Sequence, residues 1–531
     1  MGREALRHQP NVIRILSSHG GKPINIHSFL HLDISISLYP FAHSLYTITS
    51  AAYLMSSSKR RASLSIDFII VGAGIAGLAS AFRLCQAGHR VRVLDKASGP
   101  NRRAGGTHLP PNATKVLVDW GFKDELLKHA LSTRASTFIS IDTGKVIGCL
   151  EWKEDVLQET GADYMVIRYR DLYDMLYRAA VNTGARITYG ATVTQVHANP
   201  PRVELQDGTI LKADMVIGAD GPRSTVREAV VGWPCEEVPE GHSAYVAIIP
   251  RDVLQNDPEL SDLTRFHEDR PDYPIWTGDS RHVIAFTVAG GTEFAVHAFL
   301  PDSEVDGIGD QDGWDVIVPR ERLPFHFEPR LQRLLDIPAT YQRVRLFQRE
   351  CAEEWTDESG RLLLMGEAAH PLYPCVLQSC SMQIEDAEVL GTLFSRLRAW
   401  DQLPHLAEAF QELREPRTRA IYAKETKAFD TVWVGPGPQR DARDQALYGM
   451  MLEGHKGWDE TKMRWQWDEI CEVFGYNARD AAEDWWVMWG MLRERSITRE
   501  GHCPSNYTVP FCMGATVTHF AEPVLPVVLR N

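Results

Sequence analysis

Cysteine is scarce in this chain and is not arranged for cross-linking or for holding a metal ion. The 531 residues include nine cysteines, an odd number, and no two of them form a Cys-x-x-Cys pair. Disulfide frameworks and structural zinc sites both depend on closely spaced cysteines, so neither is expected here. We therefore expect no metal site and a reducing, cytoplasmic compartment.

Basic residues are too few for a nucleic-acid-binding protein. Lysine and arginine number 56 against 70 acidic residues, which gives a formal net charge of -14, and no basic patch stands out. Clustered positive charge is what binds phosphate backbones, so nucleic acid is excluded as a partner. The 44% hydrophobic and 24% charged residues are ordinary for a globular protein, and the length predicts at least two modules.

A long uncharged run lies near the N-terminus. Residues 34–54 carry no formal charge over 21 positions, which is enough to span a bilayer, although proline, histidine and many hydroxyl residues dilute the run. Three interpretations of residues 1–54 stay open: an upstream extension of the gene model before Met55, a membrane anchor, and a targeting segment. Membrane contact is expected only for an anchor. Residues 496–531 lack periodicity and are expected to form a tail.

Residues 65–96 have the pattern of a dinucleotide-binding strand, turn and helix. The apolar run 66–71 predicts a buried strand, and 78–86 predicts a helix. Three glycines in GxGxxG spacing lie between them: Gly72, Gly74 and Gly77. The first permits a tight turn, the second lets a pyrophosphate approach, and the third allows close packing of the helix. The pyrophosphate would lie at the helix N-terminus.

A carboxylate follows the next predicted strand. Residues 89–95 end in Asp95, which lies 18 positions after Gly77. A carboxylate at this place accepts hydrogen bonds from a ribose diol, which favours an unphosphorylated ribose such as that of FAD or NAD. This segment alone does not separate FAD from NAD(P).

Two downstream segments carry matching motifs. Residues 214–227 (DMVIGADGPRSTVR) are a strand running into Asp-Gly, and residues 361–394 are a strand, a polar turn and a long helix. Further matching segments are residues 106–122, 276–286 and 435–444. With these motifs the sequence resembles the flavoprotein aromatic hydroxylases, specifically salicylate-hydroxylase-like FAD-dependent monooxygenases of the fungal kind. The resemblance extends from about residue 66 to residue 493.

The resemblance implies an α/β fold. It comprises a Rossmann-like FAD-binding domain, a mixed β-sheet substrate domain like that of p-hydroxybenzoate hydroxylase, and C-terminal helices. The expected division is an extension at 1–54, the FAD-binding domain at 55–235 and 351–435, the substrate domain at 236–350, a helical region at 436–495 and a tail at 496–531.

The resemblance assigns cofactor contacts to residues in all three motifs. It places four of them against the ADP half of FAD: Gly72, Gly74, Gly77 and Asp95. Asp220 and Gly221 would touch the riboflavin side and the path of NAD(P)H. Glu367, which stands where the family usually has aspartate, would bond the ribityl chain.

Two further segments would flank the isoalloxazine ring. Pro374 and the run Gln378, Ser379 and Cys380 match a segment whose backbone N–H groups lie beside the ring, and Ser379 replaces a glycine of the family. N–H donors at the start of the following helix would stabilise the anionic reduced ring.

The opposite side of the ring is assigned to a separate loop. Gly106 and His108 fall in the loop that would pass there. An arginine before the helix at Asp171 usually contacts the flavin in this family. Both Arg168 and Arg170 are candidates for that contact, because the register does not choose between them.

The resemblance also implies a reaction. NAD(P)H would reduce FAD, and O2 would supply one oxygen atom by way of a flavin C4a-hydroperoxide to an aromatic, polyketide-like or terpenoid-like substrate in secondary metabolism. The substrate would lie under the sheet at residues 241–318. Tyr273, as an acid/base or binding group, and Pro374 are the candidate catalytic residues. Val246 stands where some fungal relatives have arginine, which favours a less acidic substrate.

Several alternatives stay open. An epoxidase, a Baeyer–Villiger-type oxygenase or a non-catalytic flavin-fold protein would share these motifs. NADH and NADPH are not distinguished, and the oligomeric state is not indicated. Glu385 and Asp386 are interpreted as simple helix charge, His370 as a packed turn residue, and the tryptophans of residues 464–489 as core.

Overall fold

The structure is a computed structural model that describes five stretches of the chain: residues 60–100, 103–264, 272–305, 316–453 and 460–492. The predictions made for residues 1–54 and for the tail at 496–531 fall outside these stretches. Within the described stretches, no helix combines the length and the apolar character that a membrane crossing requires.

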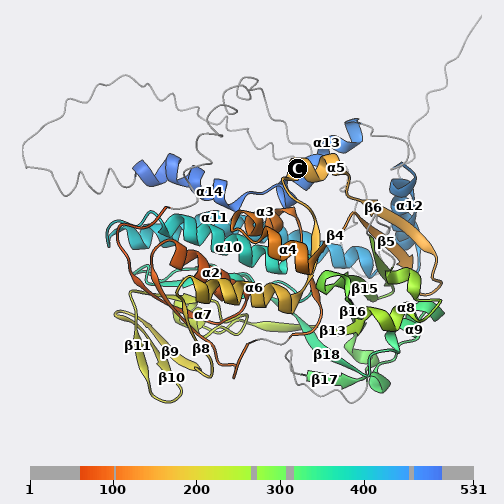
Figure 1. The fold of residues 1–531 in the computed structure, drawn as a ribbon, viewed down its shortest axis with the longest axis horizontal. Helices are drawn as coiled ribbons and strands as arrows, with labels where there is room; N and C mark the ends of the chain where they lie inside the picture. Colours follow the sequence, from red (N-terminus) through yellow and green to blue (C-terminus); the bar gives the residue numbers. More distant parts are fainter. Residues whose placement is uncertain (1–59, 101–102, 265–271, 306–315, 454–459, 493–531) are drawn as a thin grey trace, which may run out of the picture. The chain divides into compact units, whose positions relative to one another are not determined.

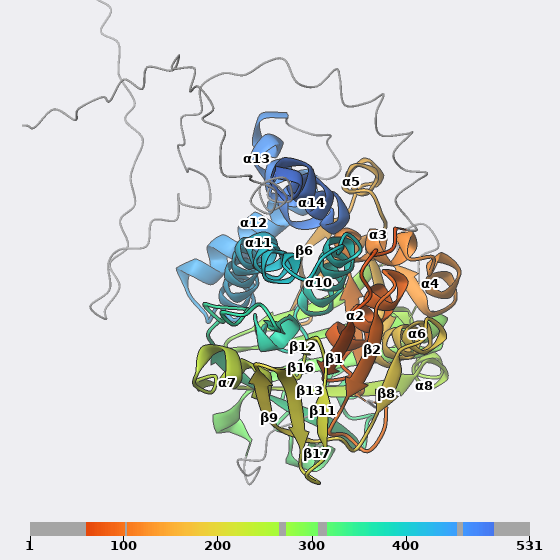
Figure 2. The same cartoon turned by 90° about the vertical axis from the view of Figure 1, so that its left-hand side faces the viewer.

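A five-stranded parallel sheet organises the α/β part of the chain; its strands are seen in Figure 2, and the helices beside it are labelled in Figure 1. Its strands in spatial order are β19 (Leu362–Leu364), β12 (Met215–Gly218), β1 (Asp67–Val71), β2 (Arg90–Leu94) and β8 (Arg186–Thr188). Helix α2 (Ile75–Gln86) packs against both α6 (Tyr169–Asn182) and α10 (Ser379–Phe394). The strands predicted at 66–71 and 89–95 are confirmed. The helix predicted at 78–86 is also confirmed, although it begins earlier, at Ile75.

A second, eight-stranded sheet is mostly antiparallel. In spatial order it contains β17 (Val316–Pro319), β18 (Thr340–Arg349), β13 (Glu237–Pro250), β16 (Glu293–Pro301), β15 (Arg281–Val288), β14 (Asp272–Gly278), β5 (Ala135–Ser140) and β6 (Val146–Glu151). The pairing of β5 with β14 is parallel, which makes the sheet mixed. Strands β5 and β6 come from residues that the sequence analysis placed with the FAD-binding domain, and the domain boundaries stay a prediction.

Two small antiparallel sheets complete the strand structure of the described residues. One contains β3 (Gly106–Leu109), β7 (Met165–Arg168) and β4 (Ala130–Ser132), and the other contains β11 (Ile210–Lys212), β10 (Pro201–Leu205) and β9 (Val193–Ala198). Strand β3 contacts α10 and α6, whereas β7 and β4 contact β15. The first small sheet therefore joins the helices of the α/β part to the eight-stranded sheet.

Short helices connect these strands. They are α3 (Pro111–Asp119), α4 (Lys123–His129), α5 (Glu154–Thr160), α7 (Thr225–Val231), α8 (Arg251–Gln255) and α9 (Pro329–Leu335). The C-terminal helices are α11 (Gln402–Val432), α12 (Pro438–Glu453), α13 (Glu460–Phe474) and α14 (Ala478–Trp485). Both α11 and α14 pack on α10, and α12 packs on β6 (Figure 2).

The tryptophans near the C-terminus do not all lie in the core. Trp485 and Trp486 are buried within the main hydrophobic cluster, which confirms the prediction for these two residues. Trp489 is 56% exposed, so the prediction is wrong there. A turn of π-helix at Trp486–Gly490 follows α14, and its wider turn leaves Trp486 and Gly490 buried while Val487, Met488 and Trp489 between them are exposed.

This difference predicts unequal costs for the same substitution. Trp486→Ala should lower the free energy of unfolding by about 3–5 kcal/mol, because it leaves a cavity in the core. Trp489→Ala, the matched control, should change it by less than about 0.5 kcal/mol. Urea unfolding followed by tryptophan fluorescence and circular dichroism makes the comparison. Equal effects would contradict the burial seen for the two side chains.

Candidate functional site

The motifs found in the sequence meet at one edge of the five-stranded sheet. Neighbouring parallel strands β19, β12, β1 and β2 end at this edge. Gly72 follows β1, Asp95 follows β2, Asp220 follows β12 and Gly366 follows β19. Ligands of open parallel sheets bind outside the carboxyl ends of the strands. The fold therefore brings three sequence segments, nearly 300 residues apart at the extremes, to one candidate binding edge.

The glycines of the first loop are required by close backbone approaches. Gly72 has φ +102°, and a Cβ atom on it would lie 2.2 Å from the carbonyl oxygen of Ala219. A Cβ on Gly77 would lie 1.9 Å from the carbonyl oxygen of Gly72. By contrast, a Cβ on Gly74 would meet nothing within 4 Å, and Gly74 begins α2 without a side-chain cap. This open helix N-terminus fits a pyrophosphate.

Asp95 holds the glycine loop in place from the neighbouring strand. Its Oδ2 accepts a hydrogen bond from the backbone N–H of Ala73 at 2.7 Å, and its Oδ1 accepts one from Ala97 at 2.8 Å. Each carboxylate oxygen can accept a further bond, so the side chain remains able to receive ribose hydroxyls. Asp95 thus orients the loop and presents a carboxylate beside it.

The carboxyl group of Asp220 accepts hydrogen bonds at the start of helix α7. The oxygens accept hydrogen bonds from the Ser224 hydroxyl and from the backbone N–H of Thr225, at the first turn of α7. Burial raises the pKa of Asp220 to about 6, against these hydrogen bonds, which lower it. Gly221 has φ +81° with open space at its Cβ position. The Asp220 carboxyl is thus engaged at the start of α7, while the space beside Gly221 is open.

Glu367 belongs to a cluster that the sequence analysis identified only in part. It lies in the turn after β19 and interacts electrostatically with Tyr169, Cys375 and Cys380. The Arg103 guanidinium lies 5.5 Å from the centroid of the Tyr169 ring. Burial raises the pKa of Tyr169 to about 12, so its hydroxyl stays protonated. Within the described residues, Glu367 forms no hydrogen bond or ion pair, which leaves its carboxylate available to a ribityl chain.

The two candidate arginines point elsewhere. Arg168 forms ion pairs with Asp171 at 2.7 Å and with Glu293 at 2.8 Å, which ties α6 to β16. The Arg170 side chain is 57% exposed and lies 3.7 Å from Asp174. Tyr169, between them, is the residue that faces the cluster with Glu367. The predicted contact of Arg168 or Arg170 with the flavin stays a prediction, and the sequence analysis did not identify Tyr169.

Gly106 and His108 bring β3 against the eight-stranded sheet. A Cβ on Gly106 would lie 2.3 Å from the Phe286 ring, and its N–H donates to His297 Nε2 at 3.2 Å. His108 Nδ1 lies 3.1 Å from the Tyr164 hydroxyl, and its ring centroid lies 5.3 Å from that of Tyr273. Burial lowers the pKa of His108 to about 3, so the imidazole is neutral. The structure thus brings two predicted residues, His108 and Tyr273, into one buried aromatic cluster.

The segment with Pro374, Ser379 and Cys380 leads into α10. Pro374 and Ser379 are half-buried, while Cys380 is buried against Thr107 of β3, and burial raises the pKa of its thiol. Gln378 caps the helix without a side-chain bond to it. Its Nε2 is buried and has no hydrogen-bond partner in the described part of the chain. An unpaired buried donor at this helix start fits a polar edge of a bound ring.

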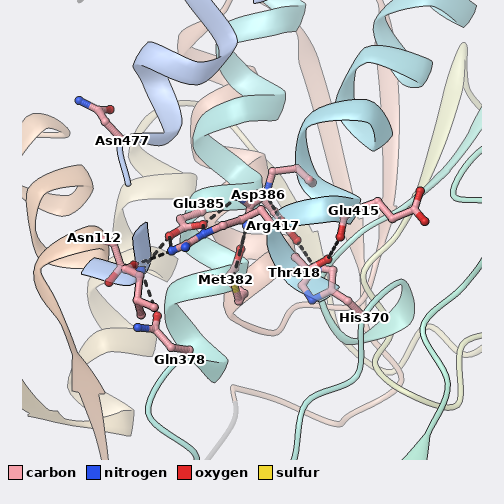
Figure 3. Close-up of polar contacts among 12 residues, drawn as sticks. Asn112, His370, Gln378, Met382, Glu385, Asp386, Glu415, Arg417, Thr418 and Asn477 are labelled. Atoms are coloured by element: carbon pink, nitrogen blue, oxygen red, sulfur yellow. Dashed lines mark hydrogen bonds and ion pairs between the residues drawn. The ribbon is translucent and has the colours of Figure 1, made fainter. Parts of the chain in front are cut away.

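A buried ionic network that the sequence analysis did not identify connects the turn after β19 with the start of α10 (Figure 3). Asp386 accepts hydrogen bonds from the Gly366 N–H at 2.9 Å, from His370 Nε2 at 2.6 Å and from Arg414 Nε at 2.7 Å. Burial by itself would raise the pKa of Asp386, but His370 and Arg414 lower it to about 2. Asp386 therefore fixes the turn that carries Glu367.

Glu385 forms the other half of the network. It pairs with Arg414 at 2.7 Å and with Arg417 at 3.0 Å, and it accepts a hydrogen bond from Asn112 Nδ2 at 2.7 Å. Asn112 Nδ2 also lies 3.0 Å from Gln378 Oε1. The carboxyls of Glu385 and Asp386 are fully buried, so the interpretation of this pair as simple helix charge is wrong. The sequence signal that indicates this burial is the distribution of apolar residues on every side of α10, because a helix that is apolar all round is buried.

Comparison with known proteins supports this description. Residues 65–424 match the family model described as FAD binding domain. The chain is 29% identical to the FAD-dependent monooxygenase OpS4 of Beauveria bassiana, over 72% of this chain and 89% of that protein. It is 28% identical to 3-amino-4-hydroxybenzoate 2-monooxygenase of Streptomyces cremeus, over 74% and 94%. A salicylate hydroxylase in complex with its substrate has a TM-score of 0.61 at 19% identity, over 79% and 97%.

The network predicts that Arg414 of α11 is essential for the stability of the fold and that Arg419 of the same helix is not. Arg414→Leu leaves Glu385 and Asp386 buried without their shared cation, so the free energy of unfolding should fall by about 3–5 kcal/mol. Arg419→Leu, on the same helix, removes a side chain that is 53% exposed and should change it by less than about 0.5 kcal/mol. Denaturant unfolding of both variants tests this. A stable Arg414→Leu protein would contradict the network.

Proposed function

The chain belongs to the FAD binding domain family, and we propose that it is a monooxygenase that uses NAD(P)H and O2 to hydroxylate an aromatic or other electron-rich small molecule. The observation that supports this most is the meeting of three segments at one sheet edge, beside a buried aromatic cluster of the eight-stranded sheet. The relatives' names support a hydroxylated aromatic substrate, since one acts on 3-amino-4-hydroxybenzoate and another on 3-hydroxybenzoate. A role in forming a secondary metabolite agrees with the fungal relatives.

The predicted fold class, the predicted family and FAD as cofactor are confirmed by the matches. When bound, FAD would supply electron transfer from NAD(P)H and the activation of O2. The N-terminus of α2 at Gly74 would hold the pyrophosphate, Asp95 the ribose and Glu367 the ribityl chain. The start of α10, with the free Nε2 of Gln378, would face the ring.

The remaining task of the protein is to exclude water and to orient the substrate. Tyr273 is 4% exposed and Tyr164 is 1% exposed, and they pack with His108 and Phe286. These side chains would form an apolar surface that excludes water. Its two tyrosine hydroxyl groups could bind a polar substituent of an aromatic substrate. Pro374 and the turn at Cys375, which has φ +64°, would form the wall nearest the ring.

We expect the purified full-length protein to be yellow, with one non-covalently bound FAD per chain. With a substrate present, NAD(P)H oxidation and O2 consumption should yield a product heavier by one oxygen atom, measured by mass spectrometry. A protein that stays colourless after addition of excess FAD would overturn the proposal. Flavin binding without any oxygenated product from a broad aromatic panel would favour a non-catalytic flavin-fold protein, and the product's structure would separate hydroxylation from epoxidation or ester formation.

Substitutions at Glu367 test its proposed contact with the ribityl chain. A hydrogen bond to a charged group contributes about 1.5–3 kcal/mol, so Glu367→Ala should weaken FAD binding by about ten- to a hundredfold. Glu367→Asp keeps the charge and should bind almost normally, whereas Glu367→Gln should resemble the alanine variant. Fluorescence titration with FAD measures the affinities, with the exposed Glu354→Ala as the control. Equal affinity for Glu, Gln and Ala would show that Glu367 does not contact the cofactor.

A further inference from the structure

One buried amide group lies in the candidate site with its hydrogen-bond donors unpaired. Gln378 is 1% exposed and is the N-cap residue of α10, although its side chain makes no bond to the helix. Its Oε1 accepts a hydrogen bond from Asn112 Nδ2 at 3.0 Å, whereas its Nε2 is buried and has no hydrogen-bond partner among the residues that the structure describes. Buried polar atoms are nearly always paired, so this donor indicates a ligand that supplies the acceptor.

The buried ionic network decides which end of this amide is left unpaired (Figure 3). Burial by itself would raise the pKa of Glu385, but Arg417 and Arg414 lower it, so the carboxylate is ionised and can only accept hydrogen bonds. The Asn112 atom that lies 2.7 Å from it must therefore be the amide nitrogen. The same nitrogen also donates to Gln378, so the Gln378 atom beside it must be the oxygen. The N–H donors of Gln378 are consequently the end of the amide that a ligand can meet.

Gln378 also lies next to the buried aromatic cluster of the eight-stranded sheet. Leu377, the residue before it, packs against the hydrophobic cluster that contains Tyr164 and Tyr273. Asn112, its hydrogen-bond partner, is in α3, and α10 contacts both α3 and β3. The proposed function places the start of α10 beside the flavin ring, and a substrate that receives oxygen from that ring must lie next to it. The unpaired donor is therefore located where cofactor, substrate and aromatic cluster would meet.

We propose that Gln378 determines substrate specificity by donating a hydrogen bond to a carbonyl oxygen on an aromatic substrate, and that Asn112 and Glu385 are the positioning residues that orient its amide. This inference rests on the proposed function and adds the class of substrate. A carbonyl oxygen has lone pairs and no proton of its own, so it matches a group that offers only N–H donors. A ligand with a methylene in the same place would leave a buried donor unpaired, and sites built for a polar group reject apolar analogues for this reason.

Binding of matched ligand pairs to the FAD-loaded full chain tests the proposal. The probes are 4-hydroxyacetophenone against 4-ethylphenol and 2-acetylnaphthalene against 2-ethylnaphthalene, titrated by the change in flavin absorbance. Within each pair, a carbonyl group replaces a methylene and the ring is the same. The wild type should bind the ketone about tenfold more tightly, because the ethyl compound leaves the donor unpaired. In Gln378→Leu this preference should disappear, whereas Gln206→Leu, the same substitution at an exposed position, should behave as the wild type.

An isosteric substitution tests the orientation of the amide. Asn112→Asp replaces the amide by a carboxyl group, whose proton, when it has one, is donated to Glu385. Gln378 must then turn its Nε2 to position 112 and its oxygen to the ligand. The ketone preference should be lost or reversed although Gln378 itself is unchanged, an effect that lost packing alone would not produce. Asn256→Asp, at an exposed position, is the matched control.

The ligand-free flavin shows whether the donor serves the substrate or the cofactor. A donor that bonds the flavin would stabilise the negative charge of the reduced ring and raise its reduction potential. Gln378→Leu should therefore leave the absorbance spectrum and the reduction potential of the ligand-free protein as in the wild type. Retention of FAD by each variant shows that it is folded, and if Asn112→Asp loses FAD, the comparison of Gln378→Leu with Gln206→Leu decides.

The possible failures are distinct. If the FAD-loaded protein prefers the ethyl compounds, binds neither member of any pair, or keeps its ketone preference in Gln378→Leu, this inference is overturned while the proposed function stands. A changed reduction potential of ligand-free Gln378→Leu likewise overturns it, because the donor then serves the cofactor. A ketone preference that survives Asn112→Asp overturns the role of the positioning residues. If the protein binds no FAD, the proposed function fails and this inference fails with it.

Discussion

Arg414 is the charge on which the candidate site depends. Arg414 is on α11, and its fully buried side chain forms ion pairs with both Glu385 and Asp386 of the buried helix α10. Burying two carboxylates and a guanidinium costs several kcal/mol per ion, so such a network is a poor means of gaining stability. Its effect is positional: Asp386 fixes the turn before Glu367, and Glu385 reaches the start of α10 through Asn112. The long helix α11 is thereby locked to the two backbone segments that would face the cofactor.

The parallel sheet supplies the other constraint. Adjacent parallel strands end at the same edge, and ligands of such sheets bind outside that edge. Glycine is required there for different reasons at different positions. Gly72 and Gly77 avoid collisions with backbone oxygens, while Gly74 leaves open the place that a side chain would fill. Packing therefore requires glycine at two of the positions, and the proposed pyrophosphate contact would account for the third.

The sequence predicts the local part of this arrangement and misses the non-local part. The strand, glycines, helix and Asp95 are recognisable because each signal lies within one continuous segment. Strands β5 and β14 pair although their residues are more than a hundred positions apart, and no local sequence pattern predicts this pairing. Tyr169 was missed for a related reason: it begins α6, and its interactions with Arg103 and Glu367 join residues far apart in the sequence. Glu385 and Asp386 stand in a helix that is buried on all sides, so their charges need buried partners, and those partners come from α11, far away in the sequence.

Gln378 shows how the buried ionic network reaches the segment before α10. Its side-chain oxygen is held through Asn112 by Glu385, an acid whose charge is fixed by Arg414 and Arg417. Guanidinium partners keep a buried carboxylate ionised over the whole physiological range. The side chain of Gln378 is therefore held in one position across that range, and its Nε2 is left without a hydrogen-bond partner in the described part of the chain.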